Sequence, residues 1–407
     1  MAKAWNRTET WLALGVLGMG GLLVAIGGLW VFMSATPPLH PDASAVPSTR
    51  GSHADTRWAA AVAEGQRVMR EGVAEQNLPG ASVAVGHGGA VVWAEGFGWS
   101  DLEREEPVSP DTAFPIGTAS AAFTSAAVGL LVEQGRLQLD EAIQRDVPGF
   151  PAKQWPVTLR QVMGHVAGIR PDAGDEEPVQ QHCQDPGDAL RRFADRPLLF
   201  EPGTAYRYSN YGWMLVSVAV EHASGQPFAS FMRQQVFEPL GLDATRLHTG
   251  EGPRADDTTY YFPRFAADPR YGPQDPEPMD LSCFSGASGL LSTPSDIVQF
   301  VMAINSGGLL RPATVETLQT SQRVASGDET GFGLGWDLET VTLGGTDTRV
   351  VGYDGELRGG RLATFLTVPG SGLVVAVTAN ISHADTTSLA LRIAEAFGAA
   401  APSTSPR

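Results

Sequence analysis

Hydroxyl groups, tyrosines and one histidine stand in three short segments that could support chemistry, at residues 114–124, 160–169 and 206–210, and a fourth short segment at 332–336 consists of glycine and apolar residues. A hydroxyl at the start of a helix can act as a nucleophile, since the backbone N–H groups there favour developing negative charge. It also needs a base one turn further on. The chain has only two lysines, Lys3 and Lys153, among 28 cationic side chains. An unperturbed tyrosine is phenolate in only about one molecule in a thousand at pH 7. The residue types therefore supply hydroxyls without an obvious base.

Taken in this order, the four segments resemble the family of class C β-lactamases, D-amino-acid peptidases and related esterases. Two further segments, at 198–203 and 280–293, are similar to its mitochondrial-type serine β-lactamase-like branch. The resemblance covers residues 57 to 398. It implies an α/β fold, an α+β sandwich of the β-lactamase/transpeptidase type. It also implies a Ser-x-x-Lys motif in which the serine attacks and the lysine accepts its proton.

The resemblance places the family's serine at Thr118 and its lysine at Ala121. Phe114 and Phe123 fix this alignment, because moving the motif by two positions to use Ser120 would put Phe123 where the lysine belongs. Arginine has replaced lysine throughout the chain, which accounts for missing surface lysines but not for an alanine. We therefore expect the Thr118-x-x-Ala121 motif to be degenerate and inactive.

The family's second motif is present as Tyr208-Ser209-Asn210. The tyrosine shares the proton transfer in the family and the asparagine binds the ligand amide, so the resemblance implies these roles for Tyr208 and Asn210. A tyrosine serves as a base only when nearby cations lower its pKa from about 10. With Ala121 that help is missing, and a buried aromatic side chain with a hydrogen-bonded hydroxyl is an equally open interpretation of Tyr208.

The family's third motif, Lys or His followed by x-Gly, provides a cation for the ligand carboxylate and a backbone N–H for the oxyanion hole. The resemblance puts Tyr353 at the cationic position and Gly355 at the glycine, with two acidic neighbours adding negative charge. Arg358 or Arg361 could restore a cation, with a solvated loop residue as the alternative for each. The binding positions implied by the resemblance are Ala121, Asn210, Tyr353 and Gly355.

Hydrophobic periodicity predicts the elements that must position these residues. Helices are expected at 57–75, 120–134 and 387–397, and a hairpin joins strands at 82–86 and 90–93. Further strands are expected at 331–336, 349–353, 363–368 and 373–378, after a helical region with long loops at 140–320. This order predicts one antiparallel sheet built from both chain ends and covered by the first and last helices, with an inserted helical lobe and a pocket between the lobes.

Residues 11–32 form an uncharged apolar stretch that is long enough to cross a bilayer core of about 30 Å. Lys3 and Arg7 precede it and no cation follows until Arg50, so the positive-inside rule places residues 1–10 in the cytoplasm and the main domain outside, in the periplasm or extracellular space. A cleaved signal peptide is the alternative, which the length of the run disfavours. Beyond this anchor we expect a flexible linker at 33–56, the domain at 57–398 and a disordered tail at 399–407.

The net charge, the histidines and the cysteines indicate which ligands and covalent links to expect. A net charge of −17 argues against nucleic-acid binding, because phosphates require clustered cations. The eight histidines show no metal-ligand spacing, so no metal or other cofactor is expected, and His165 is expected to be structural. Cys183 and Cys283 are expected to form a disulfide in an oxidising compartment, with two separate buried thiols as the alternative.

Three function classes follow. We favour a membrane-anchored pseudoenzyme that binds a peptide, a cell-wall fragment or a protein partner without covalent chemistry, because the positions of the nucleophile, the base and the pocket cation are all altered. The second class is an atypical hydrolase acting on esters or D-amino-acid peptides, in which Thr118 attacks and Tyr208 is the base. The third is a structural envelope protein. Nothing in the sequence specifies an oligomeric state.

Overall fold

A central antiparallel sheet organises the protein. The structure, a computed structural model, describes residues 18–30, 37–52, 56–171, 182–248, 254–266, 268–274 and 280–400. The sheet has eight strands in the order β1-β3-β2-β11-β10-β9-β8, with β4 paired to β3. Both ends of the chain build it, because β11 pairs with β2 in its middle. The strands are β1 (Ser48–Arg50), β2 (Gly80–His87), β3 (Ala90–Asp101), β4 (Glu106–Pro107), β8 (Asp337–Leu343), β9 (Thr346–Leu357), β10 (Gly360–Val368) and β11 (Leu373–Ala379).

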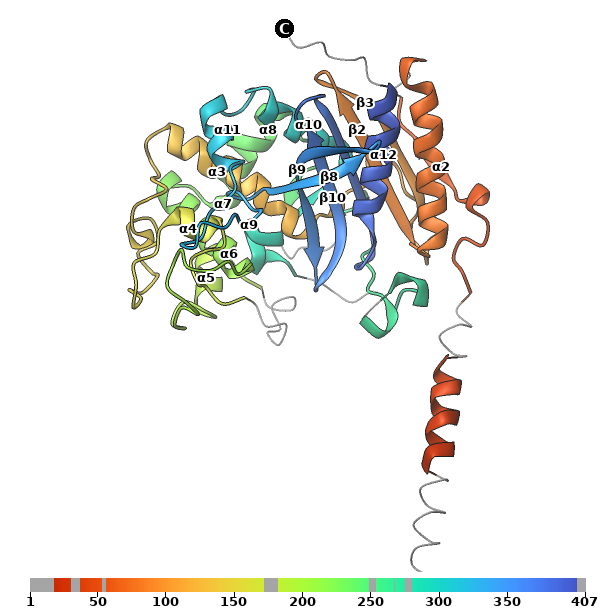
Figure 1. Cartoon of the computed structure of the whole chain (residues 1–407), viewed down its shortest axis with the longest axis horizontal. Coiled ribbons are helices and arrows are strands. Elements are labelled where there is room, and N and C mark those ends of the chain that lie inside the picture. Colours follow the sequence, from red (N-terminus) through yellow and green to blue (C-terminus); the bar gives the residue numbers. More distant parts are fainter. Residues whose placement is uncertain are drawn as a thin grey trace, which may run out of the picture.

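Helices α2 (Ala59–Glu75) and α12 (Thr386–Ala400) lie side by side on one face of this sheet (Figure 1). Successive side chains of a strand point to opposite faces, so alternate residues of the central strands pack against the two helices. Trp93 on this face is fully buried and stacks on Phe397 of α12, with 5.8 Å between the ring centroids. The predicted covering by the first and last helices is confirmed, and burial of large aromatic surfaces explains why they stay together.

Helices α3 to α11 form a lobe on the opposite side of the sheet (Figure 1). Its central helix α3 follows a 3-10 turn at Gly117–Ala119 and is buried on nearly all sides, with Phe123 stacked 3.9 Å from Phe300 of α10. The lobe contains α3 (Ser120–Glu133), α4 (Leu159–Met163), α5 (Pro186–Leu190), α6 (Asn210–Ser224), α7 (Phe228–Met232), α8 (Glu238–Leu240), α9 (Ser285–Ser288), α10 (Pro294–Asn305) and α11 (Pro312–Leu318). A small sheet joins β5 (Phe114–Pro115), β7 (Leu290–Ser292) and β6 (Arg246–Leu247).

The predicted strand at 331–336 is wrong. Gly331 and Gly335 have φ angles of +74° and +96°, which lie outside the extended region, and β8 begins only at Asp337. The aromatic residues of this stretch are nevertheless buried, Phe332 at 2% exposure and Trp336 at 0%. The apolar pattern here indicated burial in the core and not membership of the sheet.

The predicted linker at 33–56 is also wrong for the part that the structure describes. Strand β1 adds to the edge of the sheet, where Ser48 lies opposite Phe97. Arg70 of α2 donates hydrogen bonds to the Val46 carbonyl and, at 2.7 Å, to the Ser48 hydroxyl. Val46 and His40 are buried. The folded domain therefore begins before residue 57, and at its other end α12 continues to Ala400, past the predicted boundary at 398.

The N-terminal region is described only in part. Residues 18–30 are helical and extend away from the domain (Figure 1). The rest of the predicted anchor, 11–17 and 31–32, lies outside the described residues, as do 1–10 and 401–407. Within the described part of the chain, no helix combines the length and the apolar character needed to cross a membrane.

Candidate functional site

Thr118 lies in the 3-10 turn that leads into α3, and its hydroxyl is held by strand β9. The Thr118 Oγ1 accepts a hydrogen bond from the backbone N–H of Glu356 at 2.9 Å and donates one to the carbonyl of Asp354 at 3.3 Å. The residue is only 5% exposed. This hydroxyl therefore uses its proton and one of its two lone pairs in hydrogen bonds with β9.

Two glycines allow the turn and the strand to approach this closely. A Cβ on Gly117 would lie 2.2 Å from the carbonyl oxygen of Glu356, and a Cβ on Gly355 would lie 2.2 Å from that of Ile116. Gly117 also has a φ of +54°, which L side chains rarely adopt. The structure thus brings Gly355 directly against the turn that carries Thr118, as the order of motifs implied.

No described base lies at the position one turn after Thr118. Ala121 is fully buried in the lobe core. Ser120 is buried as well, and its hydroxyl donates to the Gly117 carbonyl at 2.7 Å and accepts from the Leu290 N–H at 3.1 Å, so it serves the fold. Lys153 lies elsewhere, donating to the carbonyl of Arg196 at 2.8 Å. Among the described residues, Thr118 therefore has no lysine one turn further along α3.

Tyr208, Tyr353 and Asn210 form one hydrogen-bonded group. The hydroxyls of Tyr208 and Tyr353 lie 3.0 Å apart, and Tyr208 donates to Oδ1 of Asn210 at 3.3 Å. Because the hydroxyl proton of Tyr208 is used in the bond to Asn210, Tyr353 donates the hydrogen bond between the two phenols. The structure therefore brings Tyr208 and Asn210 together with Tyr353, which lies 145 residues after Tyr208 in the chain, but it joins the two tyrosines to each other.

Burial raises the pKa of Tyr208 above its usual value, and the nearby charge of Asp337 raises it further, although hydrogen bonding with Tyr353 and Thr118 opposes the shift. Burial likewise raises the pKa of Tyr353. Both phenols therefore stay protonated at neutral pH. A neutral tyrosine cannot replace the missing lysine as proton acceptor in the resting site.

His165 packs against the tyrosine ring of this hydrogen-bonded group. It is 2% exposed, and its ring packs 4.1 Å from the ring of Tyr208 and 4.7 Å from that of Phe332. The N–H groups of Ser209 and Trp213 approach its two ring nitrogens at 3.1 Å and 3.2 Å. Burial lowers the pKa of His165 to about 3, so the ring is neutral. These contacts favour the structural role expected for His165.

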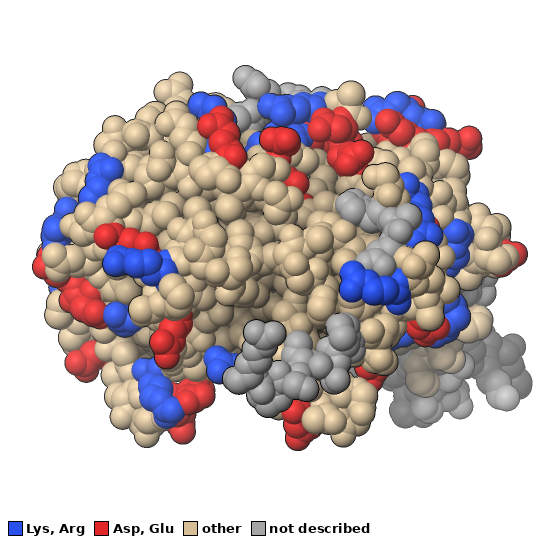
Figure 2. Space-filling model, turned by 90° about the horizontal axis from the view of Figure 1, so that it is seen from above, with Lys and Arg blue, Asp and Glu red and all other residues tan. Residues whose placement is uncertain are grey.

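Neither arginine on the third motif supplies a cation beside Tyr353. Arg361 pairs with the carboxylate of Asp354 at 3.0 Å, on the face of β9 opposite to Tyr353, and Thr387 of α12 binds the same carboxylate at 2.7 Å. Arg358 lies over the ring of Phe262, 4.6 Å from its centroid. On the face of the molecule in Figure 2, positive and negative side chains intermingle around the margin and do not gather into one cationic patch.

The sequence reasoning missed Asp337, the first residue of β8. Its Oδ2 accepts a hydrogen bond from the backbone N–H of Asp354 at 3.3 Å. Burial raises the pKa of Asp337 to about 7, although the hydrogen bond from Asp354 opposes this. The available signal was a carboxylate directly after a run of apolar residues that end in Trp336.

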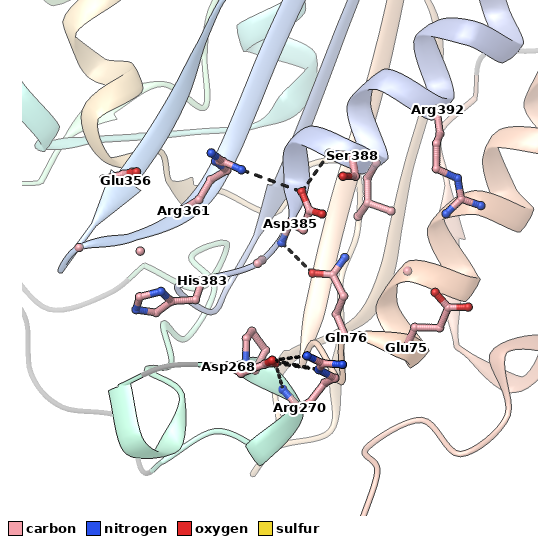
Figure 3. A pocket seen from close by; sticks show the side chains of 16 residues that line it. Glu75, Gln76, Asp268, Arg270, Glu356, Arg361, His383, Asp385, Ser388 and Arg392 are labelled. Carbon is pink, nitrogen blue, oxygen red and sulfur yellow. Dashed lines mark hydrogen bonds and ion pairs between the residues drawn. The ribbon is translucent and has the colours of Figure 1, made fainter. Parts of the chain in front are cut away.

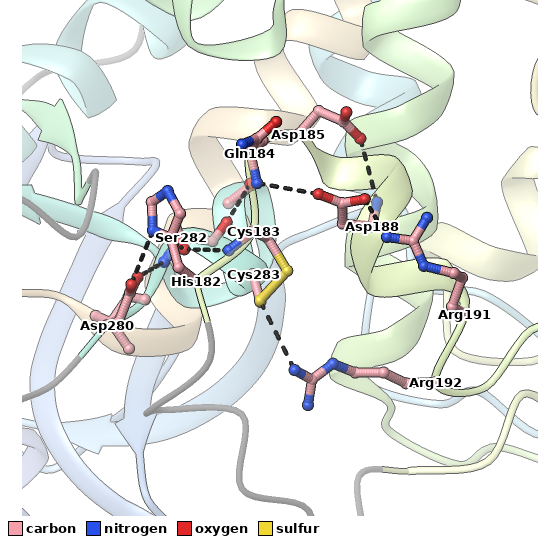
Figure 4. Close-up of a disulfide and its surroundings, with 12 residues drawn as sticks. His182, Cys183, Gln184, Asp185, Asp188, Arg191, Arg192, Asp280, Ser282 and Cys283 are labelled. Atoms are coloured by element: carbon pink, nitrogen blue, oxygen red, sulfur yellow. Dashed lines mark hydrogen bonds and ion pairs between the residues drawn. A yellow bond between two sulfur atoms is a disulfide. The ribbon is translucent and has the colours of Figure 1, made fainter.

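The predicted disulfide between Cys183 and Cys283 is confirmed, with 4.8 Å between the Cα atoms (Figure 4). It joins the segment before α5 to the 3-10 turn before α9, 100 residues further along the chain. The backbone N–H of Cys183 donates to the Ser282 hydroxyl at 2.9 Å, and His182 pairs with Asp280 at 2.9 Å beside it. The bridge ties together two loops of the helical lobe.

Comparisons with known proteins agree with this architecture. The family model described as Beta-lactamase matches residues 66–398. Penicillin-binding protein 4* of Bacillus subtilis is 26% identical over 302 residues, which cover 71% of this chain and 65% of that protein, just under two thirds of its length. The mitochondrial serine beta-lactamase-like protein LACTB of Mus musculus is 24% identical over 475 residues, which cover 89% of this chain and 84% of that protein.

Solved structures share the fold. The D-amino acid amidase from Ochrobactrum anthropi SV3, complexed with L-phenylalanine amide, superposes with a TM-score of 0.70 at 24% identity and covers 83% of this chain and 99% of its own. The structure of SurE gives a TM-score of 0.67 at 25% identity, with coverage of 86% and 78%. With a family model that matches most of the chain and a two-lobed fold in which Thr118 lies in the turn that leads into the central helix, the chain belongs to the Beta-lactamase family.

Proposed function

We propose that this protein is a membrane-anchored pseudoenzyme of the Beta-lactamase family, facing the cell exterior, that binds a peptide, a cell-wall fragment or a protein partner without forming a covalent intermediate. The observation that carries this proposal is the state of the Thr118 hydroxyl. Acyl transfer requires a hydroxyl oxygen that is free to approach a carbonyl and N–H groups that are free to bind the resulting oxyanion. Here the N–H of Glu356 donates its hydrogen bond to the hydroxyl of Thr118, so this N–H is not free to bind an oxyanion.

The missing base supports the same conclusion. Ala121 cannot accept a proton, and Tyr208 is a neutral phenol whose hydroxyl is bonded to Tyr353 and Asn210. Removal of a positioned base costs about 10² to 10⁴ in rate. The close contact of the turn with β9 at Gly117 and Gly355 nevertheless keeps the scaffold intact. A retained scaffold without proton transfer fits a binding role.

Two features support the proposed location. The disulfide at Cys183 and Cys283 fits an oxidising compartment, because disulfides are rare where thiols are kept reduced. The uncharged stretch 11–32 has the length of a membrane anchor, and its described part, 18–30, is helical and exposed. The peptide-like ligand class is suggested by relatives such as the amidase complexed with L-phenylalanine amide.

One observation favours the second candidate, an atypical hydrolase. The hydroxyl of Thr118 lies within hydrogen-bonding reach of Tyr208 and opposes the rise in the pKa of that phenol that burial causes, so a hydroxyl and a phenol are adjacent. Release of Thr118 from Glu356 on ligand binding would then give a slow nucleophile. This route requires β9 to move away from Gly117, because the hydroxyl at present donates its proton to the Asp354 carbonyl and accepts the N–H of Glu356.

Intact-protein mass spectrometry distinguishes the two candidates. The full chain is incubated with a penicillin and with a fluorophosphonate, and turnover of a chromogenic cephalosporin is followed in parallel. The pseudoenzyme gives neither an adduct nor turnover. Stoichiometric acylation that maps to Thr118 and disappears in Thr118→Val, which keeps the shape of the side chain, would establish the hydrolase instead.

A further inference from the structure

A short aromatic segment, residues 258–271, lies across one end of the central sheet. Aromatic side chains occupy five of its fourteen positions, against 8% of the whole chain. Two tyrosines fasten the segment to the sheet. The Tyr261 hydroxyl accepts a hydrogen bond from the N–H of Leu102 at 2.9 Å, just after β3, and the hydroxyls of Tyr260 and Ser382 lie 2.7 Å apart, just after β11. The segment therefore covers the end of the sheet at which β3 and β11 finish.

Phe265 of this segment is not packed into the core. It is 49% exposed, and among the described residues outside the helix at 18–30 only Leu199 and Tyr206 are other exposed large hydrophobic side chains. Its φ of +64° lies in the left-handed region, which a bulky residue rarely adopts. Tyr271 packs edge-on against its ring, with 5.8 Å between the centroids. Backbone conformations of this kind persist only where the surrounding structure holds them, and they cluster at functional sites. The segment thus holds a large apolar ring towards solvent.

The chain enters the folded domain close to this segment. The N–H of Leu39 donates a hydrogen bond to the side chain of Asn77 at 2.6 Å, and a ring nitrogen of the buried His40 lies 3.3 Å from the Pro79 carbonyl oxygen. Both partners lie between the end of α2 and the beginning of β2. Only residues 33–38 separate Leu39 from the apolar stretch 11–32. Even a fully extended chain therefore keeps Leu39 within about 25 Å of the end of that stretch.

The aromatic segment and this entry point belong to the same end of the domain. Strand β2 begins just after Pro79 and pairs with both β3 and β11, whose ends carry the segment. Asp268 and Arg270 of the segment line the same cavity as Gln76, the residue before Asn77 (Figure 3). Figure 1 shows the segment, in green, at the end of the domain from which the helix at 18–30 extends. Phe265 is therefore exposed on the side where the apolar stretch departs.

The charges of the segment suit a lipid surface. Arg264 and Arg270 are exposed, and the single carboxylate among residues 258–271, Asp268, pairs with Arg270 at 2.5 Å. Two arginines and one aspartate leave the segment with a charge of +1, in a chain of net charge −17. Aromatic rings beside arginines are typical of membrane interfaces, where the ring enters the headgroup region and the guanidinium stays among the headgroups. Glu75 and Asp385 lie nearby, so we expect the contact to be chiefly apolar and not to require anionic lipid (Figure 3).

We propose that residues 264–271 form a second membrane contact, in which the ring of Phe265 enters the headgroup region of the bilayer that holds residues 11–32. This inference rests on the proposed membrane anchor and extends it. One attachment leaves the domain free to tumble above the bilayer, whereas two attachments fix which end faces the lipid. The turn between β2 and β3 then points away from the membrane, because the eight residues of β2 span about 25 Å.

Collisional quenching of a bimane label by nitroxide-bearing lipids tests the contact on the full chain in phosphatidylcholine vesicles. Arg264→Cys places the label beside Phe265 and keeps the ring, Leu22→Cys places it in the anchor, and Ala90→Cys places it at the far turn of the β2–β3 hairpin. The native cysteines are joined in a disulfide and do not take up the label. We expect quenching at positions 22 and 264 to be at least about threefold greater than at position 90, because only these labels reach the lipid.

Two variants assign the contact to the ring. Phe265→Asn keeps a residue that tolerates the left-handed backbone and should reduce quenching at position 264 to the level of position 90. Leu199→Asn removes another exposed apolar side chain, 57% exposed, and is the matched control that should leave quenching unchanged. Strong quenching at position 22 with none at position 264, or quenching at 264 that survives Phe265→Asn, would overturn the second contact and leave the anchor in place. Loss of quenching at position 22, with failure of the protein to float with the vesicles, would overturn the anchor and this contact together.

Discussion

Restoring both missing catalytic groups should restore acylation if the scaffold is otherwise intact. The perturbation is Thr118→Ser combined with Ala121→Lys. A serine lacks the methyl group that helps to hold the hydroxyl of Thr118 against β9, and a lysine three residues on would lie on the same face of α3. Single substitutions should have little effect, because a nucleophile and its base act as a unit.

The expected loss of stability follows from the burial of Ala121, which is 0% exposed. Forcing a larger side chain into a packed core costs about 1 to 3 kcal/mol, and a buried ammonium adds several more unless its pKa falls. For a domain of about 350 residues, a total near 4 kcal/mol lowers the melting temperature by roughly 5 to 6 °C. The lowered lysine pKa also favours the neutral base, so we expect acylation about 10² to 10⁴ times faster than without it.

The assay is time-resolved intact mass spectrometry with a penicillin ester and a chromogenic cephalosporin. Thr118→Ser with Ala121→Met is the matched control, since methionine fills similar space without a proton acceptor. A folded lysine variant that is acylated no faster than the methionine control would refute the reasoning. The absence of a cation at Tyr353, or a site closed by the Tyr208–Tyr353 contact, would then be the cause of inactivity.

Three further predictions concern stability and topology. Cys183→Ala with Cys283→Ala opens a loop of 100 residues and should lower the unfolding free energy by up to about 4.7 kcal/mol in urea melts. Reductant should lower the unfolding free energy of the unmodified protein by a similar amount and leave that of the variant unchanged. Equal unfolding free energies in all samples would contradict this prediction. Protease accessibility in intact cells should place the region beyond Met33 outside the cytoplasmic membrane, and a mature protein beginning near residue 36 would instead indicate a cleaved signal peptide. Burial raises the pKa of Asp337 to about 7 from 3.8, so the folded state binds the proton more tightly. Stability from this group is present below about pH 4 and is lost as the pH rises towards 7. Asp337→Asn should remove this loss in denaturant melts, relative to the exposed control Asp111→Asn, and identical pH slopes for the two variants would count against it.

Local sequence was sufficient for much of the fold. Alternating and helical apolar patterns predicted the central hairpin, the helix after Thr118 and the last helix, because burial of one face imposes those periods. The pattern failed at 331–336, where Gly331 and Gly335 turn the chain, since hydrophobicity reports burial and not backbone conformation. It also failed at Ser48, because a short edge strand gains its partner only when β3 is in place.

The sequence by itself also determined which catalytic groups of the family are missing. The threonine at 118, the alanine at 121 and the tyrosine at 353 are fixed by residue type, and no folding can turn a methyl group into a base. Only the tertiary structure decided how the remaining groups are used. It set the hydroxyl of Thr118 against Glu356, joined Tyr208 to Tyr353, and turned Arg361 to the far face of the sheet. The first two pairs lie more than a hundred residues apart, and Arg361 reaches Asp354 from the neighbouring strand β10, so these contacts depend on the packing of whole elements, which no local pattern encodes.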